Sequence, residues 1–150
     1  MSTTTEACIF CSIAQGETSS RKILETDAIT AFLDIHPHRP GHTIIVTKAH
    51  YQILPSLPDE ISAQVWSAAQ KISHLLIRTL GPDGITGTAI FIANGAPAGQ
   101  RAQHLLIHII PQTEDDKLFT TQRTPAREQD ILDLAQRLRN ALSQSHGEDT

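Results

Sequence analysis

The stretch "HLLIHII" at residues 104–110 places two histidines in an otherwise hydrophobic run. In a β-strand, successive side chains alternate between the two faces, so His104, Leu106 and His108 share one face. With a rise of about 3.3 Å per residue, His104 and His108 are about 13 Å apart along the strand, too far to bind one metal ion. Each therefore needs its own partner, although a histidine on a mostly apolar strand is more often structural than catalytic.

A glycine-rich segment, "GAPAGQ" at residues 95–100, comes shortly before these histidines. Backbone N–H groups of such a loop can approach an anion, and Asn94 and Gln100 add uncharged donors and acceptors. This combination suits a phosphate, but glycine-rich segments are equally common as plain turns. Both interpretations remain open on spacing alone.

The two cysteines, Cys8 and Cys11, form a C-x-x-C pair. The start of the chain, "MSTTTEACIF", is polar and lacks the basic and apolar regions of a secretory signal, so we expect a cytoplasmic protein. In that compartment the pair indicates metal or redox chemistry rather than a structural disulfide.

Composition restricts the partners. The 150 residues are 39% hydrophobic and 19% charged, as in a globular domain, and no run approaches the roughly 20 apolar residues of a membrane helix. The net charge is −4 and the 12 basic residues are scattered, so we expect no nucleic-acid polymer and no membrane as partner. Any nucleotide ligand should be small.

Four segments have the composition of strands: 28–35, 42–47, 87–94 and 104–110, the last ending at Pro111. The segment 36–41 between the first two is a loop, in which we expect His36 and His38 to face solvent. A long amphipathic helix runs from Asp59 to "GPDG" at 81–84. Its predicted apolar stripe consists of Ile61, Val65, Ala68, Ile72, Leu75, Leu76 and Thr79.

A second helix is predicted to begin near Thr124, with Pro125 in its first turn. Ile131, Leu134, Leu138 and Leu142 form its apolar stripe. The order of elements predicts an α+β fold, with helices packed on a largely antiparallel sheet. We expect a single domain over 1–150, with a core at about 8–112, a helical extension at 113–142 and a frayed tail at 143–150.

Four segments together resemble the histidine-triad (HIT) family, in its Hint-like branch, over about residues 8–112. They are "CIFCSI" near the N-terminus, "AFLDIHPHRPGH" (31–42), "GHTIIVTKAH" (41–50) and "NGAPAGQRAQHLLIHIIP" (94–111). The resemblance implies the HIT fold, an antiparallel sheet with one long helix, and a homodimer formed through that helix and the neighbouring strand. It also implies binding of purine nucleotides, with hydrolysis or transfer of nucleoside monophosphoryl groups.

The family motif is His-φ-His-φ-His-φ-φ, where φ is hydrophobic, and here Leu106 occupies the middle position. In active relatives the middle histidine attacks the α-phosphorus and forms a nucleotidyl-histidine. Leucine has no lone pair, so that covalent route is closed. His108 is about 6.6 Å further along the strand, whereas attack requires about 3.5 Å, so it cannot replace the nucleophile.

The resemblance also implies a role for each matching residue. Asp34 would hold the ribose hydroxyls and His108 a phosphate oxygen, while His42 would border the active site. Arg101 stands where a small hydroxyl residue is common, and it either adds a permanent positive charge beside a phosphate or faces solvent. The remaining nucleotide-binding candidates are Phe10, Phe32 and Ile35 at the base and Asn94, Gly99 and Gln100 at the phosphates.

In relatives with an N-terminal C-x-x-C, zinc is held by that pair and two histidines. The corresponding residues are Cys8, Cys11, His50 and His104. Two thiolates and two imidazoles suit a closed, tetrahedral structural zinc. The alternative is a pair of reduced cysteines packed as small hydrophobic residues.

These features predict a purine nucleotide-binding protein on an enzyme scaffold. Its ligand would be a purine nucleoside monophosphate or a related nucleotide, with at most weak hydrolysis of nucleoside phosphoramidates or nucleotides. The alternative is an active phosphohydrolase or nucleotidyl transferase in which His42 or His108 activates water directly. A third interpretation is a structural module with an empty pocket. It is less favoured, because polar residues buried around an empty pocket would lower stability without a ligand to compensate.

Overall fold

The structure is a computed structural model that describes residues 8–116 and 125–145. The chain divides into two compact units, Met1–Asp116 and Lys117–Thr150. The division falls four residues after the end of the predicted core at residue 112. The first unit contains the sheet and all the candidate site residues.

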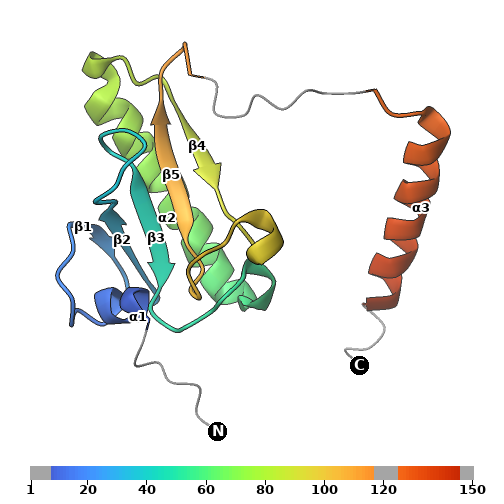
Figure 1. Cartoon of the computed structure of the whole chain (residues 1–150), viewed down its shortest axis with the longest axis horizontal. Helices are drawn as coiled ribbons and strands as arrows, with labels where there is room; N and C mark the ends of the chain where they lie inside the picture. The colour runs from blue at the N-terminus through green and yellow to red at the C-terminus, as the bar shows by residue number, and fades with distance from the viewer. Residues whose placement is uncertain (1–7, 117–124, 146–150) are drawn as a thin grey trace, which may run out of the picture. The chain divides into compact units, whose positions relative to one another are not determined.

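A five-stranded antiparallel sheet forms the centre of the first unit (Figure 1). Its strands are β1 (Lys22–Glu25), β2 (Ile29–Leu33), β3 (Thr43–Thr47), β4 (Gly87–Phe91) and β5 (Ile107–Gln112), in the order β1-β2-β3-β5-β4. The α+β class with an antiparallel sheet is confirmed. Strand β1, a four-residue edge strand with mostly exposed side chains, is not predicted by the sequence pattern.

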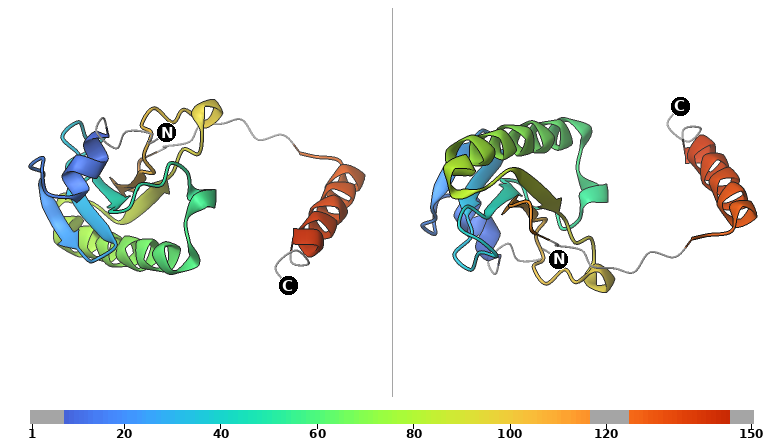
Figure 2. Two further views of the ribbon diagram at one scale, coloured as in Figure 1. Left: turned by 90° about the horizontal axis from the view of Figure 1, so that it is seen from below. Right: turned by 90° about the horizontal axis from the view of Figure 1, so that it is seen from above.

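Two helices cover opposite faces of the sheet (Figure 2). The long helix α2 (Asp59–Leu80) packs on one face, and the short helix α1 (Ile9–Ala14) packs on the other. Three short 3-10 turns complete the described part of this unit: η2 (Leu54–Ser56), η3 (Gly81–Asp83) and η4 (Ala96–Ala98). No helix among the described residues is long and apolar enough to cross a membrane.

The predicted stripe of α2 is largely correct. Val65, Ala68, Ile72 and Leu76 are buried against the sheet, whereas Leu75 is 45% exposed and Thr79, in the last turn, is exposed as well. Because each residue turns the helix by 100°, Leu75 lies on the shoulder of the stripe and points away from the core.

Strand alternation divides the apolar residues between two cores. Leu105, Ile107 and Ile109 are fully buried on the α2 side, while Leu106 packs with Phe32 and other residues on the α1 side. The predicted split of the "HLLIHII" stretch into two faces therefore agrees with the structure. However, β5 begins only at Ile107, so residues 104–106 continue the alternation ahead of the strand.

Pro111 lies inside β5 and does not end it, which corrects the sequence analysis. The pairing of β5 with β3 stops at Ile109, and beyond it only β4 continues alongside, with Thr88 opposite Pro111. The Pro111 carbonyl accepts a hydrogen bond from Arg39. The missing N–H points to the same side, past the end of the β3 pairing, so proline removes no ladder bond there.

The other predicted strands are somewhat shorter in the structure, and α3 differs at its start. Helix α3 spans Glu128–Ser145, and residues 125–127 are not helical, so Pro125 is not in its first turn. The predicted start at Thr124 lies outside the described residues. Residues 143–145, predicted as part of the frayed tail, belong to the helix.

Candidate functional site

Two cavities on the α1 side of the sheet share the lining residues Phe10, Leu106 and His108. The first has a volume of about 590 Å³ and the second about 450 Å³. Both fall in the size range of small-molecule sites. Leu106, which the resemblance aligns with the middle histidine of the triad, is therefore at the junction between them.

The first cavity is mostly apolar. Phe32 and Ile35, two of the predicted base-pocket residues, line it together with Asp34. Ser20 also lines it, and its hydroxyl oxygen is buried without a hydrogen-bond partner among the described residues. An unpaired buried hydroxyl costs about 1–3 kcal/mol, so a polar group of a ligand would be favourable there.

The second cavity is lined by Gly99, Gln100 and Arg101, three of the predicted phosphate-side residues. Its glycine loop is closed on itself: the N–H groups of Gly99 and Gln100 donate to Ala96 and Gly95 carbonyls at 2.9 and 3.2 Å. Gly99 has φ +88°, the left-handed conformation that this closure needs and that glycine adopts without strain. These N–H groups are therefore not available to an anion.

The side chains of Gln100 and Asn94 are also engaged with backbone. Gln100 accepts the Gly95 N–H at 2.7 Å and donates to the carbonyls of Gln52 and Ala102 at 2.7 and 2.9 Å. Asn94 accepts the Leu54 N–H at 2.8 Å and lines neither of the two cavities. In this structure both amides organise the loop, whereas the sequence analysis expected them at the phosphates.

Arg101 is different, because its guanidinium makes no hydrogen bond or ion pair with any described residue. It is exposed and lines the second cavity, which has no aspartate or glutamate in its lining. It is also the only residue in that lining with a permanent charge. The described part of the chain therefore leaves this cation available to an anionic ligand.

A chain of hydrogen bonds connects three histidines beside the junction. The backbone N–H of His38 donates to Nδ1 of His42 at 3.2 Å, and Nε2 of His42 lies 2.9 Å from Nδ1 of His108. His42 is only 2% exposed. Its pKa is lowered to about 4, mainly by burial and also by His108 and His38, against the opposing effect of Asp34.

These contacts fix where the protons are. His42 is neutral near pH 7 and its Nδ1 accepts a backbone donor, so its proton is on Nε2, which donates to His108. Burial also lowers the pKa of His108, so that ring is neutral and carries its proton on Nε2. His108 therefore offers an N–H donor at the junction, and the Nδ1 lone pairs of both rings are occupied.

The ligand atoms of Asp34, His42 and His108 lie within 4.8 Å of one another, a spacing compatible with a metal ion. Metal binding would need the lone pair of His42 Nε2, which would move the proton to Nδ1, opposite the His38 N–H. Two donors would then face each other, and a metal-bound histidine normally donates its second N–H to an acceptor. This cluster fits a hydrogen-bond chain better than a metal site.

The second cluster, Cys8, Cys11, His50 and His104, also has its ligand atoms within 4.8 Å of one another. Cys11 Sγ lies 3.1 Å from His50 Nδ1 and 3.5 Å from His104 Nδ1. The Nε2 of His104 lies 3.0 Å from the Thr47 carbonyl and donates to it, so its Nδ1 lone pair faces the sulfur atoms. Here the hydrogen bond leaves the lone pair available, as a metal ligand requires.

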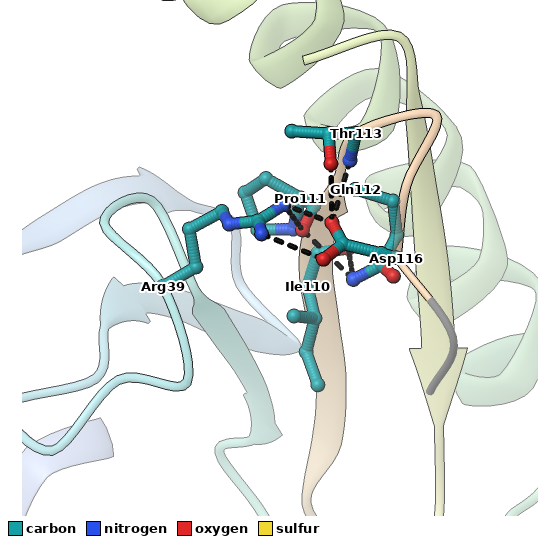
Figure 3. Close-up of polar contacts among 6 residues, drawn as sticks. All are labelled: Arg39, Ile110, Pro111, Gln112, Thr113 and Asp116. Carbon is teal, nitrogen blue, oxygen red and sulfur yellow. Dashed lines mark hydrogen bonds and ion pairs between the residues drawn. The ribbon is translucent and has the colours of Figure 1, made fainter. Parts of the chain in front are cut away.

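The β2–β3 loop, which carries His36, His38 and His42, is held to the end of β5 by polar contacts of Arg39 (Figure 3). Arg39 forms a two-pronged ion pair with Asp116 and donates to the Pro111 carbonyl, and Asp116 also accepts the Thr113 N–H at 2.7 Å. The Arg39 guanidinium holds the pKa of Asp116 far below its usual range. At the other end of the loop, Asp34 N–H donates to the His42 carbonyl at 2.9 Å.

The structure also shows residues that the sequence analysis did not assign to the site. His36 lines the first cavity, and His38 both donates to His42 and stacks on its ring at 5.4 Å between centroids. Both are exposed, as expected. Arg21 and Phe91 line the first and second cavity, respectively. No signal in the sequence indicated a role for these two histidines beyond their place in the loop at 36–41.

The chain belongs to the HIT domain family, whose sequence pattern matches residues 15–115. It is 36% identical over 121 residues to adenylylsulfatase HINT3 of Arabidopsis thaliana, covering 81% of this chain and 60% of that protein. It thus spans less than two thirds of that relative. It is 32% identical over 143 residues to adenosine 5'-monophosphoramidase HNT1 of Saccharomyces cerevisiae, covering 95% of this chain and 85% of the relative.

Solved structures agree with the fold. A HIT family protein of Bacillus subtilis has a TM-score of 0.81 at 29% identity, covering 90% of this chain and 96% of the other. A histidine triad nucleotide-binding protein of Candida albicans has 0.78 at 29%, covering 93% and 99%. A zinc-bound histidine triad family protein of Mycobacterium smegmatis has 0.68 at 30%, covering 95% and 98%. The family assignment and the HIT fold are therefore confirmed.

Proposed function

We propose that this protein binds a purine nucleoside monophosphate or a related nucleotide in the first cavity, with its phosphate at the junction of the two cavities, without forming a covalent nucleotidyl-histidine. The observation that carries the proposal is the position of Leu106, which lies at the junction beside the N–H donor of His108. The names of HINT3 and HNT1 refer to action on adenylyl compounds, which supports a nucleotide as ligand. The site would therefore retain binding and lack the family's nucleophile.

Different residues would bind the base, the ribose and the phosphate of the ligand. The base would lie in the first cavity between Phe10 and Phe32, within reach of the unpaired Ser20 hydroxyl. Asp34 would accept hydrogen bonds from the ribose hydroxyls. The Nε2–H of His108 would donate to an α-phosphate oxygen at the junction.

Direct activation of water, the alternative mechanism, has less support. A general base needs a free lone pair, and the Nδ1 lone pairs of His42 and His108 accept hydrogen bonds while their Nε2 atoms carry protons. Neither imidazole is therefore arranged to remove a proton from water. We expect slow turnover at most, from binding and electrostatic effects alone.

The test restores the missing imidazole. Calorimetry should show binding of AMP or GMP to the wild-type chain, while turnover of a fluorogenic adenosine phosphoramidate should be near the background rate. Leu106→His should raise that turnover by about a hundredfold or more, because it returns a nucleophile to the junction. Leu106→Gln is the matched control, since it adds polarity without a comparable nucleophile.

Two results would contradict the proposal. Wild-type turnover equal to that of Leu106→His would mean that catalysis needs no covalent step. Absence of AMP and GMP binding would mean that the cavities are vestigial.

We further propose that Cys8, Cys11, His50 and His104 hold a structural zinc ion. The support is their mutual spacing within 4.8 Å, the orientation of His104 by the Thr47 carbonyl and the zinc-bound relative from Mycobacterium smegmatis. Such an ion would join α1 to the segment ahead of β5. Because zinc thiolates require reduced cysteines, we place the protein in the cytoplasm.

Metal analysis tests the zinc proposal. We expect about one zinc per chain, lost in Cys11→Ser and retained in the neighbouring control Ser12→Ala. Removing the metal with a strong chelator should lower the melting temperature by more than about 5 °C, because the ion binds only the folded chain. A metal-free wild-type protein with an unchanged melting temperature would contradict the proposal and favour two packed, reduced thiols.

We also propose a homodimer formed through α2 and β4. Strand β4 is at the edge of the described sheet, and Ile90 on it is 42% exposed. Ile90 pairs with Ile109, so it lies on the α2 face of the sheet. Trp66 on α2 is also exposed, which makes this side a candidate interface.

A further inference from the structure

The second cavity contains a cation, Arg101, beyond the junction where the phosphate of a nucleoside monophosphate would end. We propose that it binds a second anionic group attached to the α-phosphate, a β-phosphate or a sulfate, and that Arg101 selects for it. The ligand class is then a nucleoside 5'-diphosphate or a mixed anhydride of a nucleoside monophosphate. This inference rests on the proposed function, because it requires the nucleoside to occupy the first cavity.

The order of groups along the site leads to this assignment. Asp34 and the aromatic residues lie in the first cavity, and His108 lies where the two cavities meet. A nucleotide with its ribose at Asp34 and its α-phosphate at His108 points the far side of that phosphate into the second cavity. Whatever is bonded there enters a space of about 450 Å³.

The donors of the second cavity then determine which group fits. The N–H groups of Gly99 and Gln100 and the amide of Gln100 are engaged within the loop. His104 faces the cysteines and the Thr47 carbonyl. Arg101 is thus the cation available in this lining, and no carboxylate opposes it.

A guanidinium beside a second anion gains more than one beside a neutral group. It can donate two parallel N–H bonds to a phosphate or a sulfate, and such charge-assisted bonds are stronger than neutral ones. A neutral substituent on the α-phosphate would leave Arg101 in solvent and gain nothing from it.

Calorimetry with four ligands tests the proposal: AMP, ADP, adenosine 5'-phosphosulfate and the neutral-substituent analogue adenosine 5'-phosphoramidate. In the wild-type chain, ADP or the phosphosulfate should bind about tenfold more tightly than AMP, and the phosphoramidate should not. Arg101→Gln should reduce this advantage to within about twofold and leave AMP affinity within about threefold. A preference between ADP and the phosphosulfate identifies which anion the cavity favours.

Two further variants separate selection by Arg101 from general charge. Lys22→Gln removes one positive charge from β1, at the opposite edge of the sheet and outside both cavities, and should keep the tenfold advantage. Arg101→Lys keeps the charge and should retain part of the advantage. The advantage should also shrink as salt is raised, more in wild type than in Arg101→Gln.

The possible failures are distinguishable. If AMP binds but ADP and the phosphosulfate bind no more tightly, or if Arg101→Gln leaves their advantage intact, this inference is overturned and the proposed function stands. If none of the four ligands binds, this inference is overturned, and if GMP does not bind either, the proposed function is overturned as well.

Discussion

His42 is buried beside two other histidines, and its hydrogen bonds require a neutral ring. Its folded-state pKa is about 4, below the value of 6.5 for an unperturbed histidine. Between these values the unfolded chain binds more protons than the folded chain, so stability should fall as pH falls from 6.5 toward 4. The contribution of His42 is at most about 3.5 kcal/mol, at about 1.4 kcal/mol for each pKa unit.

Urea unfolding across this range measures the effect, and His42→Asn should reduce the slope. Burial lowers the pKa of His108 in the same direction, so part of the slope should remain in the variant. NMR gives the direct check, since the His42 imidazole should remain neutral at about pH 5. A normal titration of His42 near pH 6.5 would show that the ring is not held in this hydrogen-bond chain.

For the site residues, the sequence predicted where they lie better than what each side chain does. It placed Leu106, His108 and Asp34 together, and the structure brings them to one pair of cavities. It expected Gln100 at the phosphates, whereas the structure engages its amide with three backbone groups. It missed the part played by His38, because the contact is made by the backbone N–H, which every residue except proline has and which the residue type therefore does not mark.

The β2–β3 loop gives a prediction at the scale of elements. Arg39→Gln should release this loop from the end of β5, because it removes the ion pair with Asp116 and the bond to the Pro111 carbonyl. Hydrogen exchange of the His38 amide, which donates to His42, should then accelerate by about tenfold. AMP affinity should fall as well, because the loop carries Asp34 and His42.

Asp116→Asn should produce a similar change, and the double variant should be little worse than either single one, since both act on one contact. Lys22→Gln, which breaks an exposed ion pair with Glu25 on β1, is the control and should not affect the loop. Unchanged exchange of the His38 amide in Arg39→Gln would show that the loop is held by other contacts.

Periodicity predicted the long elements and failed on the short ones. The 3.6-residue pattern predicted α2, and short apolar or β-branched runs predicted four of the five strands. Helix α1 and strand β1 have six and four residues, too few to show a period. Pro111 was predicted to end the strand because proline lacks the N–H that a strand with neighbours on both sides needs for its hydrogen bonds. It lies inside β5 because the pairing with β3 stops at Ile109, which depends on tertiary structure and is not visible in the local sequence.

The architecture of the whole molecule followed from the order of elements together with the family resemblance. The order of elements indicated an α+β fold with an antiparallel sheet, and the resemblance supplied the HIT topology. The division into two units at Asp116 was less accessible, because the residues around it are polar and carry no pattern. Whether two chains associate depends on surfaces, and the sequence gives no direct account of exposure.

The exposed edge strand β4 is part of the proposed dimer interface, and a charge placed on it should prevent dimer formation. Ile90→Glu should convert a dimer into a monomer of 16.4 kDa, measured by light scattering after size-exclusion chromatography. The reason is that a charge would be buried at an apolar edge without a partner. Ile23→Glu is the matched control, since Ile23 is 38% exposed on β1 at the opposite edge. It should remain dimeric, with the same circular dichroism as Ile90→Glu.

A wild-type chain that is monomeric, or an Ile90→Glu variant that still dimerises, would exclude β4 as the interface. The exposure of Trp66 on α2 would then not be due to a dimer formed through β4.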